Sequence, residues 1–482
     1  MIKKTTYQDN LKRDTLKYLP VKILPAIVGL LTIFFLTRSL STTVYANYSF
    51  IIATILIFSQ LISGWVNSAV LFFFPDYDKN GTLERLKVDV VRLQSILYAI
   101  GAIGFSIVIY IGLRELTLVL CALFLLFAQT FLNLLYSFLQ AERRVLVQIK
   151  STSIQSIVQL LGIFCCYLYC PNDLGFVILV LFLSYFAANI YVIYADKMFG
   201  LIIEGFFSQL KFEGAKKILY YGLPICLWFF ASQFYAVGDR ILLKYFNVNF
   251  LAGNYASFRD LAVGVSGFIT MPLLMASHPI IVQMWKSGAN KKEIENVVSQ
   301  NIMLLTTLFT PFFIALFLLG QWIMNIVVGD AYLLENYLMI LVLASIFFGT
   351  VSMYLHKGLE VTGKTLVMAK MALVTAIFSF VGNCFFIPEY GVKGVCIVAV
   401  LSQLLYCVLI YNLSRKAICI KIPILFIVKH VTFVLLAFMY SKIFIENSIL
   451  DLVMRFVILS CFTIYLFTSS SEVRAMIKLI KA

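Results

Sequence analysis

Polar side chains recur at helical spacing inside three long apolar segments. They are Gln129, Asn133, Ser137 and Gln140 in one segment, Gln60, Ser63 and Asn67 in another, and Ser232, Tyr235 and Asp239 in a third. Steps of three and four residues place each set on one face of an α-helix. Such groups can replace the water around a hydroxyl-rich ligand, so the stripes indicate a water-accessible lumen. The alternative is hydrogen bonding between helices, worth about 0.6 kcal/mol per contact, and three extended stripes favour the lumen.

Charged residues stand near the ends of the segments that open each half of the chain. Arg38 closes the first segment, Asp239 and Arg240 hold the equivalent place in the seventh, and Arg259 and Asp260 begin the eighth. A guanidinium group stays charged and binds two oxygens at once, which suits a phosphate or pyrophosphate. The alternatives are snorkelling to the interface and structural ion pairs. Asp239 and Asp260 are also candidates for carrying a coupling proton or sodium ion.

These patterns predict a site for an anionic, hydroxyl-rich substrate. Its candidate binding residues are Arg38, Arg240, Arg259, Gln60, Asn67, Gln129, Asn133 and Tyr235. No metal site is expected, since the three histidines are far apart in sequence and the ten cysteines form no CxxC pair. No nucleotide-binding loop is present, so ATP hydrolysis is not expected. No cofactor is predicted.

The elements that carry these residues are membrane spans. Hydrophobic residues make up 62% of the 482-residue chain and charged residues 13%, against about 25% charged in a soluble domain. We therefore predict an all-α polytopic membrane protein with about fourteen spans of the necessary length. They cover 18–36, 48–74, 90–113, 116–139, 154–170, 174–194, 218–245, 255–282, 297–318, 337–355, 366–387, 394–412, 422–440 and 452–467.

Loop charges predict the orientation of these spans. Basic residues crowd the N-terminal tail and every second loop, whereas the loops between hold almost only Arg114, Lys244, Lys393 and Lys442. By the positive-inside rule both termini lie in the cytoplasm. The net charge of +15 is thus dispersed among short loops, which argues against nucleic acid as a partner. The first apolar run has no small-residue cleavage site after it and should remain in the membrane as the first helix.

An internal repeat predicts the domain organisation. Residues 139–150 (LQAERRVLVQIK) align without a gap to residues 359–370 (LEVTGKTLVMAK), and both follow the fourth span of their half. Six spans is an even number, so the halves are parallel repeats around a central cavity. The expected parts are a six-helix bundle at 1–195, a cytoplasmic linker at 196–217, a second bundle at 218–413, and two further helices with a tail at 414–482.

Several short motifs resemble those of bacterial polysaccharide exporters. Gly222-Leu-Pro, the Asp239-Arg240 pair and Gly253-Asn-Tyr255 follow one another as in the seventh-helix signature of that family, and 386–395 (FIPEYGVKGV) is similar to its Pro-x-x-Gly-x-x-Gly turn. The chain resembles the polysaccharide-biosynthesis flippases of the multidrug/oligosaccharidyl-lipid/polysaccharide (MOP) exporter superfamily. The first half departs from the motif, because Thr37 stands where the second half has Asp239.

This resemblance implies two MATE-like six-helix bundles in a bacterial cytoplasmic membrane. It implies transfer of an undecaprenyl-pyrophosphate-linked repeat unit of O-antigen, capsule or exopolysaccharide to the outer leaflet, beside the polysaccharide polymerase machinery. Two alternatives share the superfamily, an ion-coupled multidrug antiporter and a peptidoglycan-precursor flippase. A membrane-bound polymerase or acyltransferase is the distant alternative, because such enzymes need a large external loop or an intramembrane catalytic histidine. His278 and His430 stand alone in the sequence.

Overall fold

The computed structural model describes residues 23–207, 212–248, 251–442 and 449–470. In these ranges almost every residue is helical, as the apolar runs predict. The helices are Ile23–Ser39 and α2 (Thr42–Ser59), η1 (Gln60–Gly64), α3 (Trp65–Lys79), α4 (Leu83–Leu113), α5 (Leu116–Ala141), α6 (Val145–Tyr169), α7 (Leu174–Ala195), α8 (Phe199–Phe207), α9 (Phe212–Tyr245), α10 (Ala252–Lys286), α11 (Lys291–Val328), η2 (Asp330–Tyr332), α12 (Asn336–Leu355), α13 (Lys357–Val361), α14 (Thr365–Tyr390), α15 (Val392–Ser414), α16 (Ile424–Ser441) and α17 (Ile449–Ser469).

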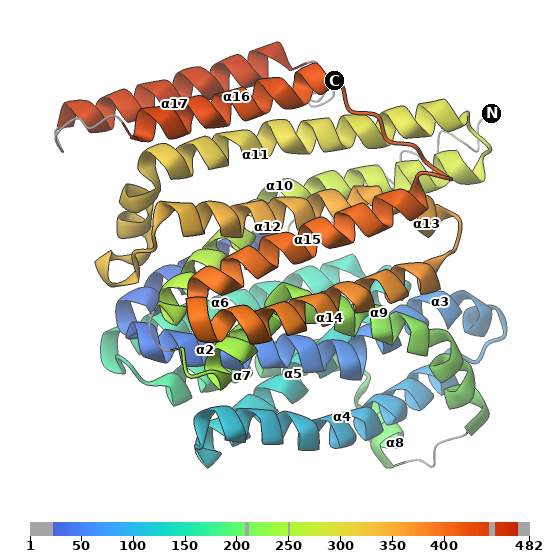
Figure 1. The fold of residues 1–482 in the computed structure, drawn as a ribbon. Coiled ribbons are helices and arrows are strands. Elements are labelled where there is room, and N and C mark those ends of the chain that lie inside the picture. Colours follow the sequence, from blue (N-terminus) through green and yellow to red (C-terminus); the bar gives the residue numbers. More distant parts are fainter. Residues whose placement is uncertain (1–22, 208–211, 249–250, 443–448, 471–482) are drawn as a thin grey trace. The chain divides into compact units, whose positions relative to one another are not determined.

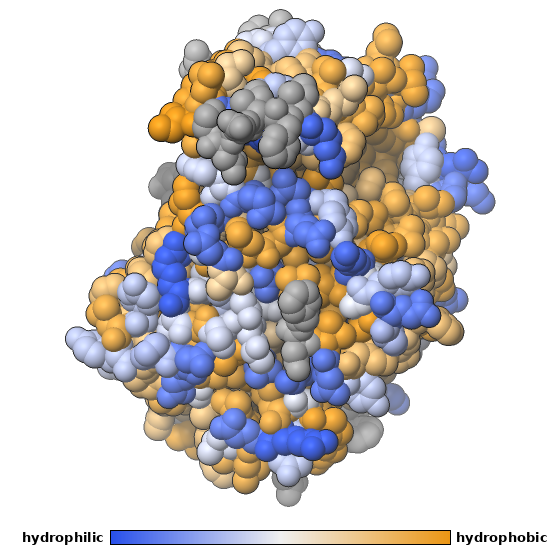
Figure 2. Space-filling view, turned by 60° about the vertical axis from the view of Figure 1, so that its left-hand side comes forward, coloured by the Kyte–Doolittle hydropathy of each residue, from blue (hydrophilic) through white to orange (hydrophobic). Residues whose placement is uncertain are grey.

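The predicted spans coincide with these helices. Within the described ranges, thirteen helical segments are long and apolar enough to cross a membrane, and Ile23–Ser39 is a shorter apolar helix at the first predicted span. Isoleucines spaced along one face of α4 are more than half exposed, namely Ile100, Ile103 and Ile107. Apolar residues likewise cover much of the surface seen in Figure 2, where lipid would be the solvent. The chain is a multi-pass integral membrane protein.

The helices form two compact units. The first contains Met1–Ala256 with Ala372–Gly391, and the second contains Ser257–Met371 with Val392–Ala482. In the first unit α2 packs on α9, α7 packs on both α5 and α6, and the short α8 lies on α4 (Figure 1). In the second, α12 packs on α15 while α16 and α17 lie beside α11 (Figure 1). The predicted division into bundles at 1–195 and 218–413 concerns internal symmetry and stays a prediction.

The two copies of the internal repeat form the same turn, each within its own unit. Arg143 and Gly363 occupy equivalent positions and both have positive φ, 57° and 71°. The next residue closes each turn in the same way, with Arg144 N donating to Leu139 O (2.8 Å) and Lys364 N to Leu359 O (2.9 Å). A left-handed residue at this place ends one helix and starts the next. The internal repeat in the amino-acid sequence is therefore also a repeat of backbone geometry.

Candidate substrate cavity

A polar cavity of about 470 Å³ lies within the first unit. Its walls come from the helix Ile23–Ser39 and from η1, α3, α5, α6, α7 and α9. The polar side chains that line it are Gln60, Ser63, Asn67, Ser68, Asn133, Tyr136, Ser137, Gln140, Gln148, Thr152, Gln155 and Tyr185. Among the described residues of this lining every polar side chain is an uncharged amide, hydroxyl or phenol. The cavity is suited to hydrogen bonding without a net electrostatic preference.

Three of the predicted binding residues lie in this lining. Gln60, Asn67 and Asn133 come from two different predicted stripes and share one cavity. Gln129 is half-buried one turn before the lining of α5 begins, and Tyr235 is half-buried on α9 without lining the cavity. The stripes on the second and fourth spans thus meet, whereas Ser232, Tyr235 and Asp239 of the third stripe do not line this cavity. The lumen stays a prediction.

The contribution of α6 was missing from the sequence-based prediction. Gln148, Thr152 and Gln155 are spaced four and three residues apart and all line the cavity. The predicted span began at residue 154, whereas the helix begins at Val145. The first two turns of α6 are too polar to be found by hydropathy, although the same spacing rule that found the other stripes applies to them.

Two buried amide oxygens in this lining lack a hydrogen-bond donor among the described residues. They are Oε1 of Gln148, whose residue is only 3% exposed, and Oδ1 of Asn67. An unsatisfied buried acceptor costs about 1–3 kcal/mol. By contrast, Ser63 and Ser137 donate to carbonyls of their own helices, Ser59 O (3.1 Å) and Leu134 O (2.7 Å). The amides are therefore the groups left to receive hydroxyl donors from a ligand.

A π-helical turn shapes one wall of the cavity. η1 (Gln60–Gly64) interrupts the long helix made by α2 and α3. The Trp65 indole donates to Leu61 O (2.8 Å), which gives a carbonyl in this widened turn a partner. A Cβ placed on Gly64 would lie 2.0 Å from Gln60 Oε1, so glycine lets the Gln60 amide fold over its own helix. Single π-turns in long helices are often found at functional sites.

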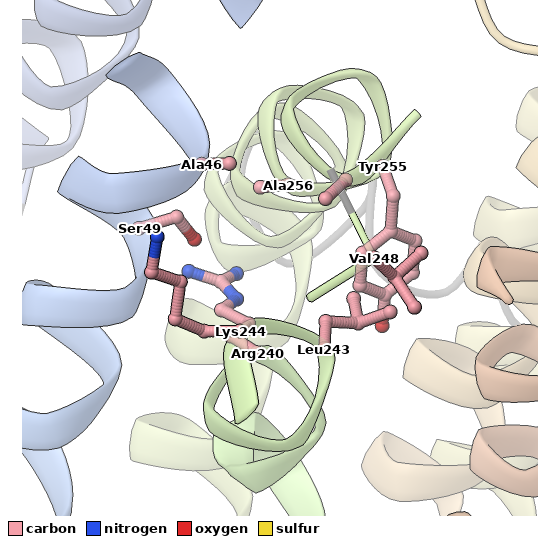
Figure 3. A pocket seen from close by; sticks show the side chains of 9 residues that line it. Ala46, Ser49, Arg240, Leu243, Lys244, Val248, Tyr255 and Ala256 are labelled. Carbon is pink, nitrogen blue, oxygen red and sulfur yellow. The ribbon is translucent and has the colours of Figure 1, made fainter. Parts of the chain in front are cut away.

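The predicted cationic residue Arg240 lies in a different, smaller cavity of about 20 Å³ in the same unit. Figure 3 shows Arg240 and Lys244 extending from α9 toward Ser49 on α2. Lys244 Nζ donates to Asn47 Oδ1 (2.8 Å). Arg240 is eleven residues beyond Phe229, which lines the polar cavity, and this separation corresponds to about 16 Å along the helix. The cationic and uncharged sites are thus at different depths.

The acidic partner in the motif is held by a tyrosine. Asp239 Oδ2 accepts from the Tyr255 hydroxyl (2.5 Å), and Asp239 Oδ1 accepts from the backbone amide of Arg240 (2.8 Å). Both Asp239 and Tyr255 are buried. This geometry ties the end of α9 to the first turn of α10 inside the first unit. The proposed ion-coupling role of Asp239 stays a prediction.

The remaining predicted residues lie elsewhere. Arg38 is exposed, and its guanidinium donates to Phe34 O (3.0 Å) and sits 3.5 Å from the centre of the Phe34 ring. Arg259 and Asp260 lie on α10 in the second unit, the former 5% exposed and the latter half-buried. Arg38 is thus engaged with its own helix, a contact that spacing rules do not reveal.

The second unit holds a charged cluster that the sequence did not predict, because His278 is far from the other members along the chain. Lys357 Nζ lies 2.6 Å from Glu360 Oε2 and 2.8 Å from His278 Nδ1. The nearest His356 nitrogen is 3.7 Å from the same carboxylate. His278 stands alone in sequence but meets α13 in space. The carboxylate lies between the lysine and the two imidazoles, which favours a structural junction between α10, α12 and α13.

Comparisons with known proteins agree with this architecture. The family described as polysaccharide biosynthesis protein matches residues 11–285, more than half of the chain. A probable low-salt glycan biosynthesis flippase, Agl15 of Haloferax volcanii, is 22% identical over 121 residues, which are 25% of this chain and 26% of that protein. The match therefore spans about a quarter of the curated relative.

Solved structures share the fold over nearly the whole chain. The lipid II flippase MurJ in an inward closed conformation superposes with a TM-score of 0.73 at 14% identity, covering 96% of this chain and 99% of that one. An inward-facing multidrug resistance MATE family transporter of the MOP superfamily gives 0.59 at 14% identity, covering 83% and 97%. The predicted transporter fold is confirmed, and the chain belongs to the polysaccharide biosynthesis protein family.

Proposed function

We propose that this protein flips an undecaprenyl-pyrophosphate-linked oligosaccharide repeat unit of O-antigen, capsule or exopolysaccharide. Transfer would run from the cytoplasmic to the outer leaflet of a bacterial cytoplasmic membrane by alternating access. The observation that carries this proposal is the uncharged amide- and hydroxyl-lined cavity with two unsatisfied acceptors, Gln148 Oε1 and Asn67 Oδ1. The similarity to a glycan biosynthesis flippase supports the same substrate class.

The chemistry of the cavity matches the barrier that a sugar meets. Each hydroxyl that enters hydrocarbon loses its water and costs several kcal/mol unless another partner replaces it. Amide side chains both donate and accept, so they can follow the mixed pattern of a saccharide. Tyr136 already engages Ser151 and Thr152 at 3.1 and 3.2 Å, which holds its ring at the cavity wall. Aromatic faces beside amides complete a surface for a sugar ring.

Loop charges support a position of the cavity in the cytoplasmic half of the membrane. α3 ends at Lys79, in a basic loop that the positive-inside rule assigns to the cytoplasm together with both termini. Asn67 lies twelve residues before Lys79, about 18 Å along the helix. The small Arg240 cavity faces Ala46 and Ser49 near the opposite end of α2. A head group entering from the cytoplasm would meet the uncharged cavity first.

The alternatives within the superfamily predict different cavities. An antiporter for cationic drugs would place acidic side chains in the cavity, and the described lining contains none. The lipid II flippase MurJ shares the fold over 96% of this chain, so only substrate measurements separate a lipid II flippase from the repeat-unit flippase. Asp239 and Asp260 remain our proposed groups for ion coupling, and the polymerase machinery remains a proposed partner.

The test is leaflet transfer in proteoliposomes. Purified protein is reconstituted with labelled polyprenyl-pyrophosphate oligosaccharide, and the sugar's accessibility to an impermeant reagent is followed over time. Gln148→Leu should slow transfer about tenfold, which corresponds to about 1.4 kcal/mol. The same variant should be at least as stable as the parent, because it removes an unsatisfied amide.

Gln159→Leu is the matched control. It lies on the same helix and bonds to Thr32 Oγ1 (3.1 Å) outside the cavity, so transfer should persist. If the sugar becomes accessible no faster in liposomes that contain folded parent protein than in protein-free liposomes, the proposed flippase function is contradicted. Export of cationic dyes by the same vesicles would favour the antiporter instead.

A further inference from the structure

A second and larger groove of about 770 Å³ opens in the first unit where α4 and α9 end. Its apolar wall includes Phe50, Val108, Ile111 and Ile241. A Cβ on Gly112 would lie 2.5 Å from Phe50 Cζ, so this glycine allows the ring to pack against the end of α4. Ile111 is 59% exposed and lies on the lipid-facing side of that helix. The groove is therefore an apolar channel with one side facing the bilayer.

The groove also contains two cations at a place where cations are scarce. Arg114 and Lys244 line it. Three further basic residues near the loops assigned to the outer side, Arg38, Lys393 and Lys442, each lie beside an aromatic ring instead, 3.5, 5.7 and 5.7 Å from the centres of the Phe34, Tyr337 and Phe438 rings. The positive-inside rule disfavours cations on this side, so the convergence of Arg114 and Lys244 on one groove calls for an anionic ligand.

Lys244 connects this groove to the Arg240 cavity. It lines both, and Figure 3 shows its ammonium group beside Ser49 and the guanidinium of Arg240. Its bond to Asn47 Oδ1 uses one of three ammonium protons and leaves the others for further acceptors. Glu115, the acidic neighbour of Arg114, accepts from Thr117 Oγ1 (2.8 Å) and does not line the groove. Arg114 and Lys244 thus share one groove with an apolar wall, and Lys244 also lines the cavity that contains Arg240.

We propose that this groove binds the pyrophosphate end of a polyprenyl carrier lipid, with Arg114 and Lys244 on the phosphates and the chain along the Phe50–Ile111 wall. The inference rests on the proposed function for the identity of the lipid and for its orientation. A pyrophosphate bears more negative charge than the single phosphate of a bilayer phospholipid, so it complements the two cations of this groove better. The groove lies at the outer end, where the flipped product would be held before release.

The experiment measures lipid binding to the purified full chain in detergent by native mass spectrometry. The probe is undecaprenyl pyrophosphate without sugar, compared with phosphatidylglycerol and with inorganic pyrophosphate. The double variant Arg114→Gln/Lys244→Gln should weaken binding of the polyprenyl lipid at least tenfold. The matched control Lys393→Gln/Lys442→Gln removes the same charge from the same side and should bind like the parent. Melting temperatures of both variants verify that they are folded.

Each result decides the inference. Unchanged polyprenyl-lipid affinity in the Arg114/Lys244 variant overturns it. Equal affinity for phosphatidylglycerol would make the groove a general phospholipid site, and equal affinity for inorganic pyrophosphate would remove the role of the apolar wall. Leaflet transfer by the parent protein separates this question from the proposed function. If the parent protein transfers the sugar but the Arg114/Lys244 variant binds the polyprenyl lipid like the parent, only the proposed groove site is overturned. If the groove binds the lipid but the parent protein shows no transfer, only the proposed flippase function is overturned.

Discussion

The hydroxyl of Tyr255 lies 2.5 Å from Oδ2 of Asp239, and this contact joins two short motifs that are sixteen residues apart. Both side chains are buried within the first unit. The Asp239-Arg240 pair and the Gly253-Asn-Tyr255 motif are therefore one structural unit, in which a phenol donates to a carboxyl group that hydrocarbon would otherwise surround. Their co-occurrence in the sequence reflects a requirement for hydrogen bonding.

Tyr255→Phe removes one donor to the Asp239 carboxyl group and leaves the ring in place. We expect a loss of about 1–2 kcal/mol in stability, the usual cost of losing a hydrogen bond to a carboxyl group. Thermal unfolding in detergent checks this. Tyr245→Phe is the control, because Tyr245 is 69% exposed at the end of α9, the helix that carries Asp239, and its change should be within about 0.5 kcal/mol. Equal shifts in the two variants would show that the Asp239 contact has no special role.

The glycine of the same motif, Gly253 in the first turn of α10, is required by a close backbone contact. A Cβ on Gly253 would lie 2.0 Å from Thr42 O, and a main-chain carbonyl cannot rotate away as a side chain can. Gly253→Ala should therefore cost about 1–3 kcal/mol. Gly267→Ala lies on the same helix with open space around its Cβ, and should be neutral or stabilising by up to about 1 kcal/mol. Similar melting temperatures for the two variants would contradict the close approach of α10 to α2.

Hydropathy predicted the spans because every helix face that is exposed to lipid must be apolar. It could not predict the packing that explains individual residues. A Cβ on Gly222 would lie 2.0 Å from the Trp65 ring, which accounts for the Gly-Leu-Pro opening only once α3 and α9 are seen together. Arg38 was predicted as a pyrophosphate ligand because of its guanidinium group, yet in the structure this group lies over the Phe34 ring.

Part of the lining of the uncharged cavity could be predicted from the sequence, and part could not. Gln60, Asn67 and Asn133 lie in segments whose apolar residues identify them as spans, so their periodicity was visible. Gln148 lies at the polar start of α6, outside the predicted span. Periodicity indicates a helix face, but only tertiary contacts indicate which faces meet.

The π-turn offers a test of the cavity wall itself. Gly64→Ala should push the Gln60 amide away from its place, because the added Cβ would lie 2.0 Å from Gln60 Oε1. The displaced atom is the end of a flexible side chain, so stability should change by less than about 1 kcal/mol while glycan transfer falls. In a Gln60→Ala background the Gly64 substitution should add little further loss. Additive losses in the double variant would mean that Gly64 acts independently of Gln60.

The repeated turn predicts a gain in stability. Arg143 has a positive φ of 57°, whereas the equivalent position in the second half has glycine. Left-handed geometry costs a residue with a side chain about 1 kcal/mol, part of which the greater chain entropy of glycine offsets. Arg143→Gly should therefore raise stability by about 0.5 kcal/mol, and Gly363→Ala should lower it by about 1 kcal/mol. Thermal unfolding of the Arg143→Gly and Gly363→Ala variants measures both stability changes. A loss in the first variant and a gain in the second would contradict the shared turn geometry.

The Lys357–Glu360 pair should respond unequally to loss of its two members. The lysine side chain is 4% exposed and the glutamate 29% exposed, so water can reach the carboxylate but hardly the ammonium. Glu360→Leu leaves a buried cation with His278 as its remaining partner at 2.8 Å and should cost about 3 kcal/mol. Lys357→Met leaves a carboxylate that can hydrate and should cost about 1 kcal/mol. The double variant should be more stable than Glu360→Leu alone, since it removes the uncompensated charge. If unfolding in detergent instead shows Lys357→Met to be the more damaging change, the carboxylate rather than the ammonium is the group that depends on its partner.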